Sequence, residues 1–207
     1  MKRQPAPGDI TSVTVATIRT LAALLGAIVA AAGCVHGGGP TVITGEDYAP
    51  QYDYSEFYAV ADRKLFTVMV WGNPFPGLPD AEMRQRLLPV MQANPPQARV
   101  TFTYAVPFEL PRPFYRLVLV FDPALNLNAA SVCANQVRRQ PEPSGRFAVF
   151  AIYCRNDLVL SQASAATLAS APEDPRVGAL FNQLFAVLFA QRYPERDRRH
   201  PFSIIRM

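Results

Sequence analysis

Few side chains in this sequence can act as metal ligands, nucleophiles or imidazole catalysts. The only histidines are His36 and His200, and the three cysteines are Cys34, Cys133 and Cys154. The cysteines form no Cys-x-x-Cys pair, and no Gly-x-Ser-x-Gly, phosphate-binding glycine loop, His-Glu-x-x-His or calcium-loop pattern occurs. Metal sites and histidine catalysis need such groups in clusters, so we expect no metal and no cofactor.

Carboxylates are the remaining candidates for catalysis. Glu82, Glu109 and Asp122 could serve as acid and base if the fold brought two of them together. Asp122 ends an apolar segment, a common place for functional groups, but Pro123 directly after it equally suits a turn. We therefore consider the chain more consistent with a binding protein than with an enzyme.

The first 33 residues have the pattern of an export signal. Lys2, Arg3 and Arg19 precede an apolar run at 21–33, and a basic segment followed by apolar and then small residues is typical of a secretory signal peptide. The run is shorter than the roughly 18 residues that a membrane-spanning helix requires. We predict that 1–33 is a signal peptide with a helical apolar segment.

The end of that segment, Ala31-Ala32-Gly33-Cys34, resembles the lipobox of bacterial lipoproteins. In that family the cysteine receives a diacylglyceryl group and becomes the new N-terminus, so the resemblance implies lipidation of Cys34 and anchoring to a membrane. Ala31 stands where the family more often has leucine. The alternative is ordinary cleavage just before Gly33, which would leave a soluble periplasmic protein.

The residue after the cysteine bears on the choice of membrane. In Gram-negative lipoproteins an aspartate there favours retention in the inner membrane, and this chain has Val35. The resemblance therefore implies the periplasmic face of the outer membrane, with an inner-membrane anchor as the alternative. Removal of 1–33 also takes away three basic residues and one acidic residue. The formal charge of +4 then falls, and we expect no nucleic-acid partner.

With Cys34 assigned to lipid, Cys133 and Cys154 remain as a pair in an exported chain. Two remaining cysteines in a protein exported to an oxidising compartment favour a disulfide between them. The sequence therefore predicts a structural Cys133–Cys154 bridge.

Two segments could contact a partner. The first, 71–77, contains Trp71, Asn73 and Phe75; it resembles sequences of uncharacterised proteobacterial lipoproteins, a resemblance that implies no activity. Aromatic side chains in loops often bind partners, although large aromatics are usually buried. The second is the basic C-terminal end, with Arg196, Arg198 and Arg199. Arginine suits anionic lipid head groups and cell-wall carboxylates, although a solvated charged tail is the simpler interpretation.

Hydrophobic periodicity and turn residues predict the secondary structure of the exported part. Helices are expected from Asp80 to the Asn94-Pro95-Pro96 segment, after the N-cap Asn128, and after the pair Asp174-Pro175, with Pro89 kinking or ending the first of them. Strands are expected at 56–60, 65–71, 99–106, 115–121, 147–154 and 158–162.

These elements predict an α+β fold, with one mostly antiparallel sheet of four to six strands and two main helices packed against it. We expect 1–33 to be the signal peptide, 34–54 a lipidated cysteine with a flexible tether, and 55–207 one globular domain with a short basic tail. The predicted function is a lipid-anchored binding or assembly module that contacts an envelope protein or an anionic cell-wall or lipid component. The alternatives are an envelope hydrolase with a carboxylate- or serine-based site, and a purely structural lipoprotein.

Overall fold

The computed structural model of the chain describes residues 41–140 and 146–191. The expected signal peptide, Cys34 and the arginines at 196–199 lie outside these residues. The strands are β1 (Val42–Tyr48), β2 (Leu65–Trp71), β3 (Thr101–Thr103), β4 (Tyr115–Phe121), β5 (Phe147–Arg155) and β6 (Leu158–Thr167). The helices are α2 (Tyr54–Ala61), α3 (Asp80–Ala93), α4 (Ala129–Cys133) and α5 (Pro175–Leu188).

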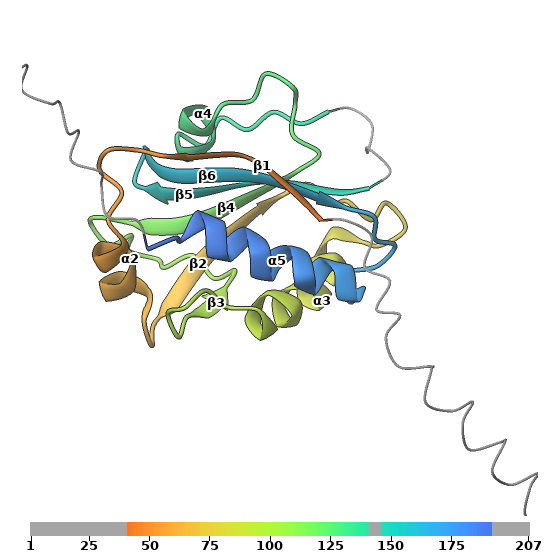
Figure 1. Ribbon diagram of the computed structural model, residues 1–207, viewed down its shortest axis with the longest axis horizontal. Helices are drawn as coiled ribbons and strands as arrows, with labels where there is room; N and C mark the ends of the chain where they lie inside the picture. The colour runs from red at the N-terminus through yellow and green to blue at the C-terminus, as the bar shows by residue number, and fades with distance from the viewer. Residues whose placement is uncertain (1–40, 141–145, 192–207) are drawn as a thin grey trace, which may run out of the picture. The chain divides into compact units, whose positions relative to one another are not determined.

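The six described strands form one sheet in the order β1-β6-β5-β4-β2-β3, so the α+β class is as predicted (Figure 1). The sheet is mixed, however, and the prediction of a mostly antiparallel sheet is wrong. β1, β6, β5 and β4 pair antiparallel, whereas β2 is parallel to both β4 and β3. The connection from β2 to β3 passes through α3, and a helical crossover of this kind allows parallel pairing that a hairpin does not.

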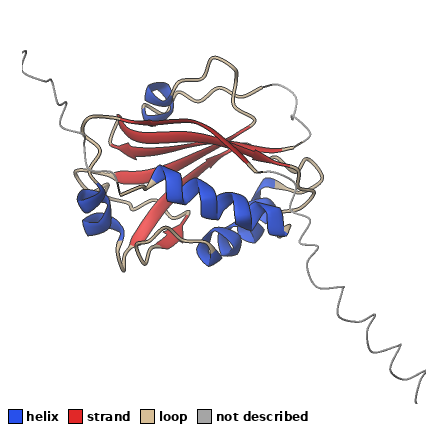
Figure 2. Cartoon of the chain, viewed as in Figure 1, coloured by secondary structure: helices blue, strands red, loops and turns tan. Residues whose placement is uncertain are grey.

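Apolar residues cover both faces of the central strand β4. Leu117, Leu119 and Phe121 belong to the main core, which also contains buried residues of α2, α3 and α5. Val118 and Val120, which alternate with them, belong to a smaller core that includes residues of α4. Figure 2 shows α5 crossing one face of the sheet, and the buried residues of this helix belong to the main core. Because side chains of a strand alternate between faces, the nearly continuous apolar run at 115–121 is explained by burial on both sides.

The globular fold begins before residue 55, where the sequence predicted a tether. Residues 42–48 form the edge strand β1, which pairs with β6. Tyr52 is buried, and its hydroxyl donates to the carbonyl oxygen of Ala190 at 2.8 Å. The predicted tether therefore contributes a strand and a buried aromatic anchor to the domain.

The strand predicted at 56–60 is also wrong, because this segment lies in helix α2. The Asp53 carboxylate accepts a hydrogen bond from the Ser55 N–H at 2.7 Å and so caps the helix N-terminus. Phe57 and Ala61, four residues apart, are both fully buried on one face. Capping and this helical spacing outweigh the β-propensity of the short apolar segment.

The remaining elements differ from expectation mainly at their ends. α3 continues past Pro89 to Ala93, with Met83, Leu87 and Met91 buried in the core. β3 covers three residues of the eight predicted to be a strand at 99–106. Among the residues that the structure describes, no helix is both long and apolar enough to cross a membrane.

Candidate functional site

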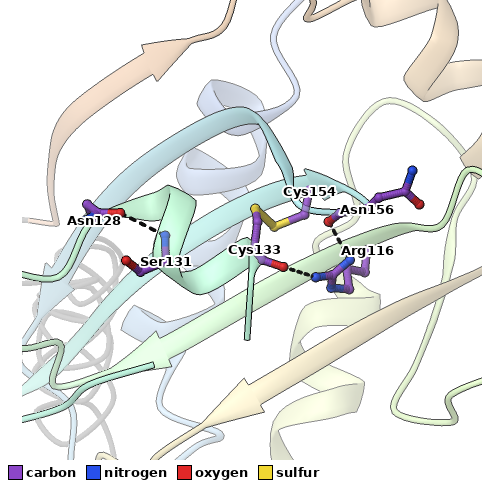
Figure 3. Close-up of a disulfide and its surroundings, with 6 residues drawn as sticks. All are labelled: Arg116, Asn128, Ser131, Cys133, Cys154 and Asn156. Atoms are coloured by element: carbon purple, nitrogen blue, oxygen red, sulfur yellow. Dashed lines mark hydrogen bonds between the residues drawn. A yellow bond between two sulfur atoms is a disulfide. The ribbon is translucent and has the colours of Figure 1, made fainter. Parts of the chain in front are cut away.

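A disulfide joins α4 to the sheet. Cys133, the last residue of α4, is bonded to Cys154 of β5 with an S–S distance of 2.01 Å (Figure 3). The helix begins where the sequence predicted, since the Asn128 side chain accepts a hydrogen bond from the Ser131 N–H at 2.8 Å. Both cysteines are fully buried. The bond therefore fixes the position of α4 over the second face of the sheet.

Beside the disulfide lies Arg116, a cation within the apolar strand β4. Its side chain shares a face with Val118 and Val120, and the residue is only 3% exposed. Nη2 donates to the carbonyl oxygen of Cys133 at 2.5 Å, and Nη1 donates to that of Asn156 at 2.8 Å (Figure 3). Asn156 lies in the turn between β5 and β6, with a φ of 50°. The disulfide-linked helix and this turn thus hold the guanidinium from two sides.

The charge of Arg116 is only partly compensated. Within the described part of the chain it forms no ion pair within 4.0 Å, and its Nε has no hydrogen-bond acceptor. Burial lowers the pKa of the guanidinium, and the Asp157 carboxylate acts in the opposite direction. The group nevertheless stays protonated, as arginine does in proteins. The Phe114 ring, 5.3 Å from the guanidinium carbon, adds a cation–π contact.

Arg116 lines an open cavity of about 510 Å³. Its polar lining also includes Arg112, Asn135, Asn156 and Asp157, and its apolar lining includes Met69, Val106, Leu110 and Phe114. One wall is the loop before β4, which is fixed to the β5–β6 turn by two hydrogen bonds. The Phe114 N–H donates to Asn156 Oδ1 at 2.9 Å, and the Asn156 N–H donates to the Phe114 carbonyl at 2.8 Å. The cavity therefore has positively charged side chains on one part of its wall and apolar side chains on another, and hydrogen bonds between the loop before β4 and the β5–β6 turn hold its shape.

The turn predicted as a partner surface is mostly internal. Phe75 is 5% exposed and packs against Phe147 with ring centroids 5.7 Å apart, so its assignment to a contact surface is wrong. Asn73 shapes the turn, because its amide donates to the Leu78 carbonyl and accepts from the Phe75 N–H. Of the three residues, Trp71 alone is substantially exposed, at 36%.

The candidate carboxylates lie on different elements. Glu82 on α3 forms an exposed ion pair with Arg86 at 3.2 Å, and Glu109 lies exposed in the loop before β4. Asp122, at the end of β4, is buried and lines a separate cavity that also includes Leu125 and Phe150. Residues 41–140 and 146–191 contain no group of three or more metal-ligating side chains that could hold an ion.

Sequence reasoning did not select the cavity residues. One signal was available, since Arg116 is the only charge within the apolar run at 115–121, and a charged side chain in a central strand must be compensated locally. Nothing in the sequence around Asn135 and Asn156 indicated that these residues line a cavity. Both adopt positive φ, at 60° and 50°, in short turns, where asparagine is common for conformational reasons alone.

Comparison with known proteins gives little further information. No family model matches the chain, and no curated protein matches it. Among solved structures, a PelC dodecamer from Paraburkholderia phytofirmans resembles it with 12% sequence identity over 74% of this chain and 100% of that chain, and a TM-score of 0.37. A likeness of this degree supports no conclusion about the function of this chain.

Proposed function

We propose that the chain is a lipid-anchored protein of the bacterial envelope whose exported domain binds a ligand in the cavity beside Arg116. The proposal combines two parts, the anchor at Cys34 and the binding site. The anchor is supported by the signal-peptide pattern and by the resemblance of 31–34 to a lipobox. The Cys133–Cys154 bond agrees with it, because disulfides persist mainly in exported proteins.

The observation that carries the binding function is the arrangement around Arg116. Arg116 is 3% exposed and forms no ion pair with any described residue, and such a buried cation costs folding free energy unless it is compensated. Here it is kept at the wall of an open cavity by two carbonyl groups, one of them on a disulfide-bonded residue. Concave sites with an apolar lining and a few fixed polar groups are the usual form of ligand sites.

The anchor is tested with Cys34→Ser in cells labelled with an alkyne analogue of palmitate. We expect this variant to lose the acyl label and to leave the membrane fraction. The matched control, Cys133→Ser with Cys154→Ser, should keep the label, since neither residue lies in the lipobox-like segment. A labelled, membrane-bound Cys34→Ser protein would contradict the anchor.

Binding is tested by photocrosslinking in intact cells. A photoreactive amino acid replaces Leu110, which lines the cavity and is 52% exposed, or Leu168, which does not line it and is 62% exposed. We expect a covalent adduct, detected as a mass shift of the purified protein, at position 110 only. No adduct, or equal adducts at both positions, would contradict a ligand site in this cavity.

A further inference from the structure

We propose that the cavity beside Arg116 binds a small organic monoanion, a carboxylate carrying an apolar group. This inference rests on the proposed binding function and specifies the class of ligand. It follows from three properties of the cavity, namely the charge of its lining, its available hydrogen-bond donors and the placement of its apolar side chains.

The charge of the lining matches one negative charge. Arg112 and Arg116 supply two positive charges and Asp157 supplies one negative charge, and no other ionisable residue in the described part of the chain lines the cavity. The excess is therefore a single positive charge. A dianion such as a phosphate monoester would exceed it and would also face the Asp157 carboxylate, so a monoanion fits better.

Accessible hydrogen-bond donors for a carboxylate are present on Arg112, and Arg116 adds a fixed positive charge beside them. Arg116 already uses Nη1 and Nη2 for carbonyl groups, but its buried Nε lacks an acceptor. Arg112 is exposed, and it forms no ion pair among the described residues. A guanidinium is planar and matches the geometry of a carboxylate. Arg112 is thus positioned to meet the anion directly, while Arg116 supplies the less exposed positive charge.

The apolar side chains favour an organic ligand over an inorganic anion. Phe114 and Met69 lie in the cavity wall, and Val106 and Leu110 line it while remaining about half exposed, at 53% and 52%. An apolar group of the ligand would cover this surface, and burial of apolar area is the main favourable term in association. The volume of about 510 Å³ lies within the range of about 300–1,000 Å³ typical of small-molecule sites.

The test uses the full-length protein in detergent and two probes of the same shape, 3-phenylpropionate and the neutral 3-phenylpropanamide. Binding is measured by NMR titration at constant ionic strength. We expect the carboxylate to bind with a Kd of about 1 mM or tighter, and the amide to bind at least about tenfold more weakly, since charge-assisted hydrogen bonds are the stronger ones. Equal affinities for the two probes, or no binding of the carboxylate, would overturn the proposal.

Two arginine variants show whether carboxylate binding depends on the cavity or only on the overall positive charge of the protein. Arg112→Gln should weaken carboxylate binding about tenfold without changing the melting temperature, because the side chain is exposed. The matched control is Arg138→Gln, an exposed arginine that does not line the cavity, and it should leave the affinity unchanged. Equal effects of both variants would overturn the assignment.

Two further measurements complete the test. Arg116→Lys keeps a positive charge but cannot reproduce both hydrogen bonds to the Cys133 and Asn156 carbonyls, so the charge is no longer fixed beside the cavity. We expect weaker carboxylate binding in a protein whose circular dichroism spectrum is unchanged; if it does not fold, Arg112→Gln still decides the question. Inorganic phosphate is the third probe, and tighter binding of phosphate than of phenylpropionate would overturn the proposal that the ligand is an organic monoanion.

The crosslinking experiment distinguishes failure of this inference from failure of the proposed function. If the carboxylate does not bind but the crosslink at position 110 is retained, only the ligand class is rejected. Loss of the crosslink would reject the binding function itself.

Discussion

The Nη2 atom of Arg116 lies 2.5 Å from the carbonyl oxygen of Cys133, so the charged side chain on β4 donates a hydrogen bond to a residue of the disulfide. The other end of the same guanidinium reaches the β5–β6 turn. The Arg116 guanidinium therefore links the disulfide to the β5–β6 turn beside the smaller core of the domain. A change in the position of one of these three parts should alter the position and the stability of the other two.

The first prediction concerns the disulfide. Replacing both Cys133 and Cys154 by serine should lower the free energy of unfolding by about 3 kcal/mol, because the bond closes a loop with a sequence separation of 21 residues. Urea unfolding measures the change. Reductant should lower the stability of the wild-type protein and leave that of the double variant unaffected. Equal stability of the oxidised wild type and the double variant would contradict a stabilising bond.

The second prediction concerns the attachment of α2 to the sheet. Glu56 on α2 accepts hydrogen bonds from Arg155 Nη1 at 2.8 Å and from the Tyr115 hydroxyl at 2.5 Å. Both charged side chains are 27% exposed, so solvent screens the pair only in part. Glu56→Ala should destabilise the fold by about 1–2 kcal/mol.

A double-mutant cycle isolates this contact. Tyr115→Phe removes only the hydroxyl, and its effect should shrink when Glu56 is already alanine, with a coupling energy of about 1 kcal/mol. Additive effects would show that the hydrogen bond from Tyr115 to Glu56 contributes nothing to stability.

The third prediction tests whether the segment before residue 55 belongs to the fold. Tyr52→Phe deletes the hydroxyl that donates to the Ala190 carbonyl, and it should cost about 1 kcal/mol. The control is Tyr58→Phe on α2, where the side chain is 42% exposed and the change should stay within about 0.5 kcal/mol. If Tyr52→Phe were as neutral as the control, residues around 52 would behave as a tether.

The fourth prediction concerns acid stability. Hydrogen bonds from Arg176 lower the pKa of Asp174 to about 2, from an ordinary value of 3.8. A depressed pKa means that the folded state favours the charged carboxylate, so this contribution is complete above about pH 4 and is lost as the pH falls towards 2. Asp174→Asn keeps a good N-cap side chain but removes the charge.

This variant should be less stable than the wild type by about 0.5–1 kcal/mol at pH 7, and the difference should shrink as the pH falls to 2. Urea unfolding at both pH values measures it. Asp47→Asn is the control, since Asp47 is exposed and forms no ion pair among the described residues. A difference that persisted unchanged at pH 2 would contradict the electrostatic origin.

Most of the regular elements could be predicted because their causes are local. The apolar run at 115–121, the hairpin around Asn156 and the pair Asp174-Pro175 each contain their own signal within a few residues. The strand β1 has no such signal. Its side chains are mostly exposed, and it is a strand because β6, more than a hundred residues later in the chain, offers backbone hydrogen bonds.

Whether neighbouring strands run parallel or antiparallel also could not be predicted from local sequence patterns. The sequence predicts β2 and β4 as apolar strands, but their pairing depends on the helical crossover that places both in one sheet. The same holds for the turn at 71–77, whose aromatic residues suggested a surface. Phe75 is buried because the core contains Phe147 at that point, which only the assembled fold brings there.

The sequence by itself determined the α+β class, the hairpin, the two long helices and the pairing of Cys133 with Cys154, because periodicity, capping residues and cysteine count are properties of short segments or of composition. Only the tertiary structure decided the mixed sheet, the strand before residue 55 and the cavity beside Arg116. That cavity is lined by side chains from β2, β4, the loop before β4, the turn after α4 and the β5–β6 turn. Their proximity depends on long-range packing, which no local pattern in the sequence encodes.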